Sequence, residues 1–157
     1  MTNAVFPAIH LPHLQSVLLP DFVRLRLRQP ELAALDDVAM TVGQSLTASN
    51  LFTLPTGAEI AVAVGSRGIA QIDSVTRAAI DWLKSRGYVP FIVPAMGSHG
   101  GGTAGGQRAV LAKLGICAET MGCEVRATMD MVQYGALADG TTCNFDAYAA
   151  RASGVLV

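Results

Sequence analysis

Charged side chains are scarce in this sequence. Of its 157 residues, 11 are Lys or Arg and 12 are Asp or Glu, so 15% are charged where about 25% is typical of soluble domains. The net charge of −1 argues against a nucleic-acid binder that depends on a basic field, and the 51% hydrophobic content argues against a disordered chain. A folded chain with so little charge is expected to have a surface that does not face water.

The sequence also lacks a membrane-spanning run and a convincing leader. No apolar stretch approaches the roughly 18 residues that a membrane span needs. Residues 1–20 carry no basic residue ahead of their apolar part, and Pro7 and Pro12 interrupt it, so we do not expect a secretory signal. These absences favour a cytoplasmic protein.

Paired cysteine motifs are missing as well. Cys117, Cys123 and Cys143 are odd in number and have no C-x-x-C spacing, which predicts free thiols in a reducing compartment and no disulfide framework. A metal site on these cysteines would need histidine or carboxylate neighbours, and no histidine lies nearby in sequence. His10 and His13 lie on either side of Pro12 without a further ligand, so we expect no metal site there either.

Residues 23–43 are predicted to form a strand and then a helix. Residues 23–28 alternate apolar side chains with three arginines, as a strand with one buried face does. The arginine face is either solvated or turned toward a carboxylate-rich partner. Pro30 suits the first turn of a helix, which would end near Gly43 or somewhat beyond and whose apolar face would carry Leu32, Leu35, Val38 and Val42.

From residue 59 onward, apolar strands alternate with amphipathic helices. Residues 60–64 are a continuous apolar run, typical of a strand buried on both faces of a parallel sheet. The pattern predicts an α/β domain with a mainly parallel sheet flanked by helices, Rossmann-like, which spans residues 1–157 as a single domain. The remaining predicted elements are a helix over 69–86, a strand over 89–93, a helix over 107–114, strands over 124–128 and 132–137, a turn at Asp139-Gly140, a helix over 146–152 and a strand over 154–157.

Two loops follow the first two of these strands, at the sheet edge where ligands bind in parallel α/β folds. The first loop, residues 65–68, reads Gly-Ser-Arg-Gly. Its glycines permit a tight turn or a close approach to a ligand, and Arg67 offers a planar fork to a carboxylate or phosphate. An ordinary turn with a solvated arginine is the alternative.

The second loop is rich in glycine. Six of the chain's 16 glycines fall between residues 97 and 106. A glycine-rich loop that leads into a helix presents backbone N–H groups to an anion, although this loop has neither a Walker pattern nor a clean G-x-G-x-x-G. A flexible connector is the alternative. His99 favours function, because histidine titrates near neutral pH and few side chains lie close in sequence to bury this one.

Together the two loops resemble the N-terminal domain of the nickel-pincer lactate racemase family. The resemblance rests on residues 64–69 (Val-Gly-Ser-Arg-Gly-Ile) and 90–101 (Pro-Phe-Ile-Val-Pro-Ala-Met-Gly-Ser-His-Gly-Gly). Supporting matches are Thr103, Gln107, residues 114–116 and Asp139-Gly140, so that the resemblance extends from residue 24 to residue 157. Family members are longer and have a second α/β domain, so the resemblance implies that this chain is the N-terminal domain of a two-domain protein.

The resemblance implies a cofactor and roles for individual residues. The cofactor is a nickel-bound pyridinium mononucleotide seated between the two domains. His99 matches the first of two histidines that exchange the proton of the substrate's 2-hydroxyl group while a hydride passes from the substrate carbon to the cofactor and back to the opposite face. Arg67 would contact substrate or cofactor as a catalytic residue. The residues implied for cofactor binding are Ser66, Gly97, Ser98, Gly100, Gly101, Gly102 and Thr103.

The resemblance also limits what this chain does alone. The second histidine, the lysine that anchors the cofactor and the nickel-ligating histidine would all lie after residue 157, so the isolated residues are expected to be inactive. Lactate-specific members resemble an acidic-Thr-Arg turn where this chain has Ser66-Arg67-Gly68, which argues for a different 2-hydroxy acid. Two other functions stay open: a non-catalytic nucleotide- or phosphate-binding module, and an assembly domain that forms homo-oligomers through its charge-poor surface.

Overall fold

The computed structural model describes residues 12, 18, 21, 23–28, 30, 33–49 and 54–157. The chain divides into two compact units, Met1–Ala33 and Ala34–Val157. In the first unit, residues 23–28 have no regular secondary structure, and Val23, Leu25 and Leu27 are exposed. The predicted strand with one buried face is therefore wrong, because an alternating pattern shows which face could be buried but provides no neighbouring strand to pair with.

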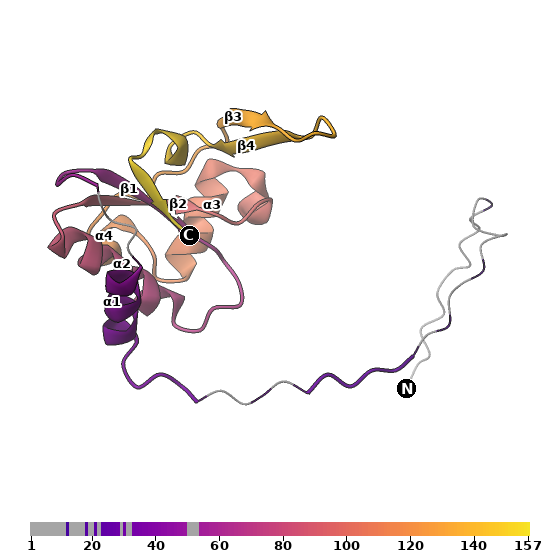
Figure 1. Ribbon diagram of the computed structural model, residues 1–157, viewed down its shortest axis with the longest axis horizontal. Helices are drawn as coiled ribbons and strands as arrows, with labels where there is room; N and C mark the ends of the chain where they lie inside the picture. Colours follow the sequence, from indigo (N-terminus) through magenta and orange to yellow (C-terminus); the bar gives the residue numbers. More distant parts are fainter. Residues whose placement is uncertain are drawn as a thin grey trace. The chain divides into compact units, whose positions relative to one another are not determined.

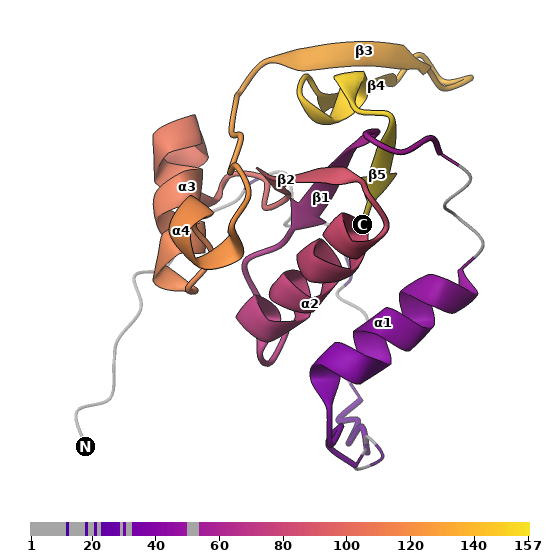
Figure 2. The same ribbon diagram turned by 90° about the vertical axis from the view of Figure 1, so that its left-hand side faces the viewer.

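Helix α1 (Val38–Ala48) opens the second unit and starts later than predicted. The Asp37 carboxylate accepts a hydrogen bond from the Met40 N–H at 2.8 Å, so Asp37 is the N-cap. A helix starting at Pro30 is wrong, and Leu35 precedes the helix and is exposed. Figure 2 shows α1 alongside α2 (Ile72–Ser85), where the Trp82 indole N–H donates to the Thr47 hydroxyl at 3.1 Å.

The centre of the second unit is a parallel sheet of three strands in the order β2-β1-β5 (Figure 1). β1 (Glu59–Val64) pairs in parallel with β2 (Val89–Pro94) on one side and with β5 (Gly154–Leu156) on the other. The predicted strands over 60–64, 89–93 and 154–157 are thus confirmed, and the fold class is α/β with a parallel sheet flanked by helices.

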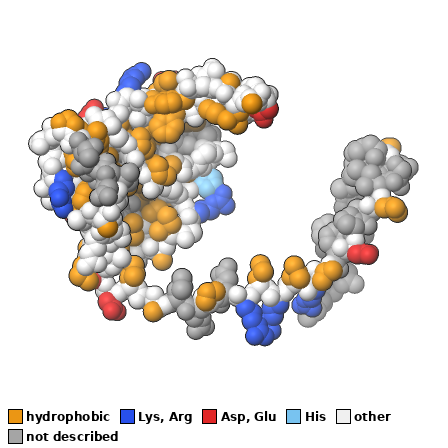
Figure 3. Space-filling view, in the orientation of Figure 1, with side chains coloured by type: hydrophobic (Ala, Val, Ile, Leu, Met, Phe, Trp, Pro, Cys, Tyr) orange, Lys and Arg blue, Asp and Glu red, His pale blue; other side chains and the backbone are white. Residues whose placement is uncertain are grey.

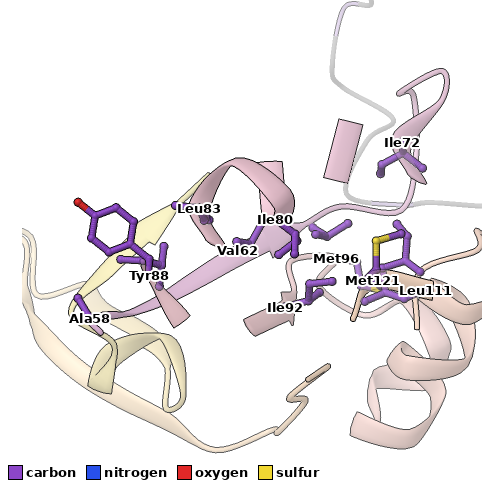
Figure 4. Close-up of a cluster of buried hydrophobic side chains, with 13 residues drawn as sticks. Ala58, Val62, Ile72, Ile80, Leu83, Tyr88, Ile92, Met96, Leu111 and Met121 are labelled. Atoms are coloured by element: carbon purple, nitrogen blue, oxygen red, sulfur yellow. The ribbon is translucent and has the colours of Figure 1, made fainter. Parts of the chain in front are cut away.

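The two faces of this sheet are covered differently. Alternate β1 residues, together with Ile92, pack with side chains of α2, α3 (Ala104–Lys113) and α4 (Ala118–Met121) in one buried cluster (Figure 4). On the other face, Ala61, Phe91 and Val93 form a smaller cluster with Ala149 from the short 3-10 helix η3 (Ala149–Arg151). β1 and β2 are therefore buried on both faces, which explains their largely apolar sequences.

A separate antiparallel hairpin follows, made of β3 (Met131–Ala136) and β4 (Thr142–Asp146). Only its first strand and its turn were predicted. Residues 124–128, predicted as a strand, contribute a single parallel bridge between Val125 and Ile92. The predicted helix over 146–152 is reduced to η3. Among the helices in the described part of the chain, none has the length and apolarity to cross a membrane.

Candidate functional site

The candidate site lies where β1 and β2 end side by side. Val64 and Pro94, the last residues of the two strands, are paired in register, and the Ala95 N–H donates to the Val64 carbonyl at 2.8 Å. Because the strands are parallel, the loops that follow them leave the same edge of the sheet. The sheet thereby brings together the two loops that follow β1 and β2. Their contacting side chains are 32 and 33 residues apart in sequence.

His99 is the point at which the two loops meet. Its Nδ1 lies 2.5 Å from the Ser66 hydroxyl oxygen, and its Nε2 is hydrogen-bonded to the Arg67 guanidinium. His99 and Ser66 are half-buried, whereas Arg67 is exposed. In Figure 3 a histidine side chain lies beside a cationic side chain at the molecular surface. The structure thus places the predicted residues Ser66, Arg67 and His99 in direct contact.

The glycines of the second loop set its backbone path. His99 begins the short 3-10 segment η2 (His99–Gly102), and Gly97, Gly100, Gly101 and Gly102 all have positive φ values. At Gly100 a close contact adds to this requirement, since a Cβ atom there would lie 2.3 Å from the carbonyl carbon of Gly106. Glycine at this position is needed so that the loop can fold back against the start of α3.

Thr103 joins this loop to helix α3. Its hydroxyl accepts from the Gly106 N–H and donates to the Gly100 carbonyl, both at 3.1 Å, so that Thr103 is the N-cap. The helix consequently begins at Ala104 rather than at residue 107 as predicted. The hydroxyl of Thr103 is engaged inside the loop, and its predicted contact with a cofactor stays a prediction.

Gln107 is a supporting residue to which the sequence pattern assigned no role. Its side chain is buried, with 5% exposed, and its Nε2 donates to the Gly97 carbonyl at 2.7 Å. This hydrogen bond ties the first turn of α3 to the residue that turns the chain toward His99. The only sequence signal was an amide next to Arg108 at the start of the helix, which does not reveal that the Gln107 side chain is buried.

Other residues of the second loop remain accessible. Ser98 is exposed, and a Cβ added at Gly101 or Gly102 would meet nothing within 4 Å. These positions leave room for a ligand close to the N-terminus of α3, where backbone N–H groups and the helix dipole favour an anion. The site therefore combines an imidazole, a guanidinium and a glycine-rich loop at the start of a helix.

An apolar pocket of about 370 Å³ borders the first loop on its other side. Its walls come from α1, α2 and the ends of β1 and β5, and include Gly65 and Ile69. The residues described as lining it do not include Ser66, Arg67 or His99. The polar contacts of His99 and this apolar pocket are therefore two separate features.

Within the described residues, no group of three or more His, Cys, Asp or Glu side chains comes together as a metal site. His10 and His13 lie outside the described residues. The three cysteines are free, and burial raises the pKa of the half-buried Cys123 thiol. Comparisons of the chain with protein-family models, with curated proteins and with solved structures found no match.

Proposed function

We propose that this chain is the N-terminal cofactor- and substrate-binding domain of a 2-hydroxy-acid racemase or epimerase, and that its sheet belongs to a Rossmann-like fold. The observation that carries the proposal is the contact of His99 with Ser66 and Arg67 at the carboxyl edge of two parallel strands. Ligands of open α/β sheets bind at this edge. The resemblance to the nickel-pincer lactate racemase family supplies the reaction class.

In the proposed reaction, Arg67 binds the carboxylate of the substrate. A guanidinium is planar and always charged, and it matches a carboxylate with two parallel hydrogen bonds. The 2-hydroxyl group, one carbon away from that carboxylate, is then directed toward His99, whose imidazole accepts the hydroxyl proton in one direction of the reaction and donates it in the other. Inversion requires a second proton-transferring group on the opposite side of the substrate, and the family resemblance places that group in a second domain.

The proposed cofactor is the nickel-pincer nucleotide, which when bound supplies the hydride-accepting position. The accessible part of the second loop fits its phosphate: Ser98 offers a hydroxyl, and Gly101 and Gly102 leave open space near the start of α3. Gly97, Gly100 and Thr103 would act by shaping this loop. The described residues form no cluster of metal ligands, so nickel would be held by the nucleotide itself and by the second domain.

The scarcity of charge supports a second domain as the partner. Between Tyr88 and Cys123 the charged residues are Arg108, Lys113 and Glu119. The residues of this stretch that are exposed beside His99, among them Ser98 and Gly101, are uncharged, as suits a face covered by a second domain. We place the protein in the cytoplasm, where free thiols such as the exposed Cys143 stay reduced.

The test uses the full-length protein that contains this chain, expressed together with the enzymes that make the cofactor. We expect bound nickel and interconversion of the two enantiomers of a 2-hydroxy acid. His99→Gln should lower the rate by about 10²–10⁴-fold, the usual contribution of a general acid–base group, with nickel content unchanged. Arg67→Met should mainly raise KM. Absence of nickel, together with a racemisation rate that His99→Gln leaves unaltered, would overturn the proposal.

The second candidate is a non-catalytic module that binds a nucleotide or phosphate. The observation in its favour is the open glycine loop at the N-terminus of α3. Calorimetry of the 157-residue chain with a pyridine mononucleotide separates the two functions. Tight binding that His99→Gln leaves unchanged, without racemisation by the full-length protein, would favour the module.

A further inference from the structure

The hydrogen bonds of His99 define which ring nitrogen carries its proton. Arginine has donors and no acceptor, and it stays charged at any pH that a protein tolerates. The Nε2 that contacts the Arg67 guanidinium must therefore be the accepting nitrogen. A ring with a lone pair on Nε2 is a neutral imidazole that carries its hydrogen on Nδ1.

The Nδ1 hydrogen then points to Ser66. The Ser66 hydroxyl oxygen lies 2.5 Å from Nδ1 and accepts this hydrogen, because a hydroxyl oxygen has two lone pairs to offer. Ser66 comes from the loop after β1, so the orientation of the imidazole depends on the pairing of β1 with β2. Ser66 thus acts as a positioning residue: the Arg67 donor sets the tautomer, and Ser66 accepts the resulting Nδ1 hydrogen and holds the ring with Nε2 turned toward Arg67.

The Arg67 guanidinium lies on Nε2 of His99, the nitrogen that would accept the proton of the substrate. A substrate hydroxyl therefore has no access to the lone pair while this contact persists. Arg67 is exposed to solvent, whereas His99 and Ser66 are half-buried, so Arg67 is the side chain that a ligand meets first. A hydrogen bond from a guanidinium to a carboxylate is roughly twice as strong as one to a neutral group. An anionic ligand that bonds to Arg67 can therefore displace its guanidinium from Nε2 of His99.

We propose that Ser66 and Arg67 hold His99 as a neutral base with a covered Nε2, and that the carboxylate of the substrate uncovers it by displacing Arg67. This inference rests on the proposed function for the identity of the substrate, but its first half concerns the chain alone. It makes Arg67 a determinant of specificity as well as a binding group. A neutral analogue of the substrate leaves the base covered, so only anionic 2-hydroxy compounds gain access to it.

The experiment is nitrogen-15 NMR of the histidine rings in the 157-residue chain at a pH above the range in which histidine titrates. His99→Gln assigns the His99 signals by their loss, which leaves His10 and His13. We expect His99 to carry its hydrogen on Nδ1. Ser66→Ala should weaken this preference and Ser66→Thr, which keeps the hydroxyl, should retain it, whereas Arg67→Met, which removes the donor to Nε2, should weaken it more. A hydrogen on Nε2 in the unaltered chain would overturn the first half of the proposal.

The second half is tested by adding sodium lactate and, in parallel, lactamide, its uncharged analogue. We expect lactate to shift the Nε2 signal and lactamide to leave it in place. Arg67→Met should shift that signal before any ligand is added and remove the response to lactate, whereas Arg151→Met, a control at another exposed arginine, should change neither. An equal response to both compounds, or none to lactate, would overturn displacement by the carboxylate.

The NMR experiments can fail or succeed independently of the test for racemisation. The NMR measurements need neither nickel nor the nucleotide, and they would stand if the full-length protein did not racemise 2-hydroxy acids. Conversely, a racemase that His99→Gln inactivates, but whose His99 carries its hydrogen on Nε2, would retain the proposed function and lose this inference.

Discussion

Two features exclude a side chain at Gly100: the left-handed conformation of its backbone and a close contact with the start of α3. Its φ is +65°, and a Cβ atom would lie 2.5 Å from the Gln107 nitrogen as well as against Gly106. Gly101, the next residue, has a similar φ of +69° but open space around it. The pair separates the requirement for a positive φ from the requirement for close packing.

We predict that Gly100→Ala costs clearly more stability than Gly101→Ala. The left-handed conformation alone costs a non-glycine residue about 1–2 kcal/mol, and forcing an extra methyl group into a packed site adds about 1–3 kcal/mol. Urea denaturation of the two variants measures the difference. Equal losses would mean that the loop does not pack against α3 as the structure describes.

The pKa of Cys123 gives a prediction at the same scale. Burial raises this pKa, and the positive charges of Lys84 and Arg77 offset part of the effect. A raised pKa leaves less thiolate at a given pH, and the thiolate is the reactive form. We expect iodoacetamide to modify Cys123 more slowly than the exposed Cys143, with the gap narrowing as the pH rises beyond about 8.5, the ordinary thiol value.

Mass spectrometry of the alkylated peptides measures these rates. In urea the two cysteines should react at similar rates, because the unfolded chain buries neither. Faster reaction at Cys123 than at Cys143 in the folded chain would contradict the burial of Cys123.

At the scale of elements, the start of α3 depends on one hydroxyl. We predict that Thr103→Ala lowers the free energy of unfolding by about 1 kcal/mol, the typical value of an N-cap, and that Thr103→Ser retains most of it. Because Thr103 also bonds the Gly100 carbonyl, the alanine variant should speed hydrogen exchange of the loop amides around His99. Thermal unfolding and exchange NMR test the two effects. A Thr103→Ala variant with unchanged stability and unchanged exchange rates would show that the Thr103 hydroxyl does not stabilise the start of α3.

The hairpin of β3 and β4 has an apolar face that the described residues leave exposed. Val132 and Phe145 are paired across the strands, and Tyr134 contacts Phe145 edge-on with the ring centroids 5.6 Å apart. All three are exposed, and Figure 3 shows hydrophobic side chains along this hairpin. A hairpin of two strands has little hydrophobic surface to bury by itself, so its stability depends on what it packs against.

At the scale of the whole molecule, the buried side chains that the structure describes all lie between Ala58 and Ala149, in the second unit. We therefore predict that residues 34–157, expressed alone, fold and unfold in one cooperative transition. The measurement is urea denaturation followed by the fluorescence of Trp82, the single tryptophan, with the full chain as the control. An unfolded or molten shortened chain would show that Met1–Ala33 completes the core.

The sequence by itself determined the elements that need only local information. The apolar run of β1, bounded by glycines, specifies a strand buried on both faces, and the amphipathic spacing of α2 specifies a helix with one buried side. The start of α1 was missed because Asp37 and Pro30 both favour a helix start, and only the folded chain shows which of them caps it. The second hairpin strand was missed because two of its five residues, Asn144 and Asp146, are of types that are depleted in strands.

For the site, the sequence named Ser66, Arg67 and His99 but not their contact. Each loop on its own also fitted an ordinary turn, since residue types do not report distances. Tertiary structure decided the matter, because the parallel pairing of β1 and β2 ends both strands at the same edge and brings Ser66 and Arg67 onto the two nitrogens of one imidazole. The inferred tautomer of His99 follows from that geometry and from the fact that arginine can only donate. The spacing of residues along the chain could not have predicted it.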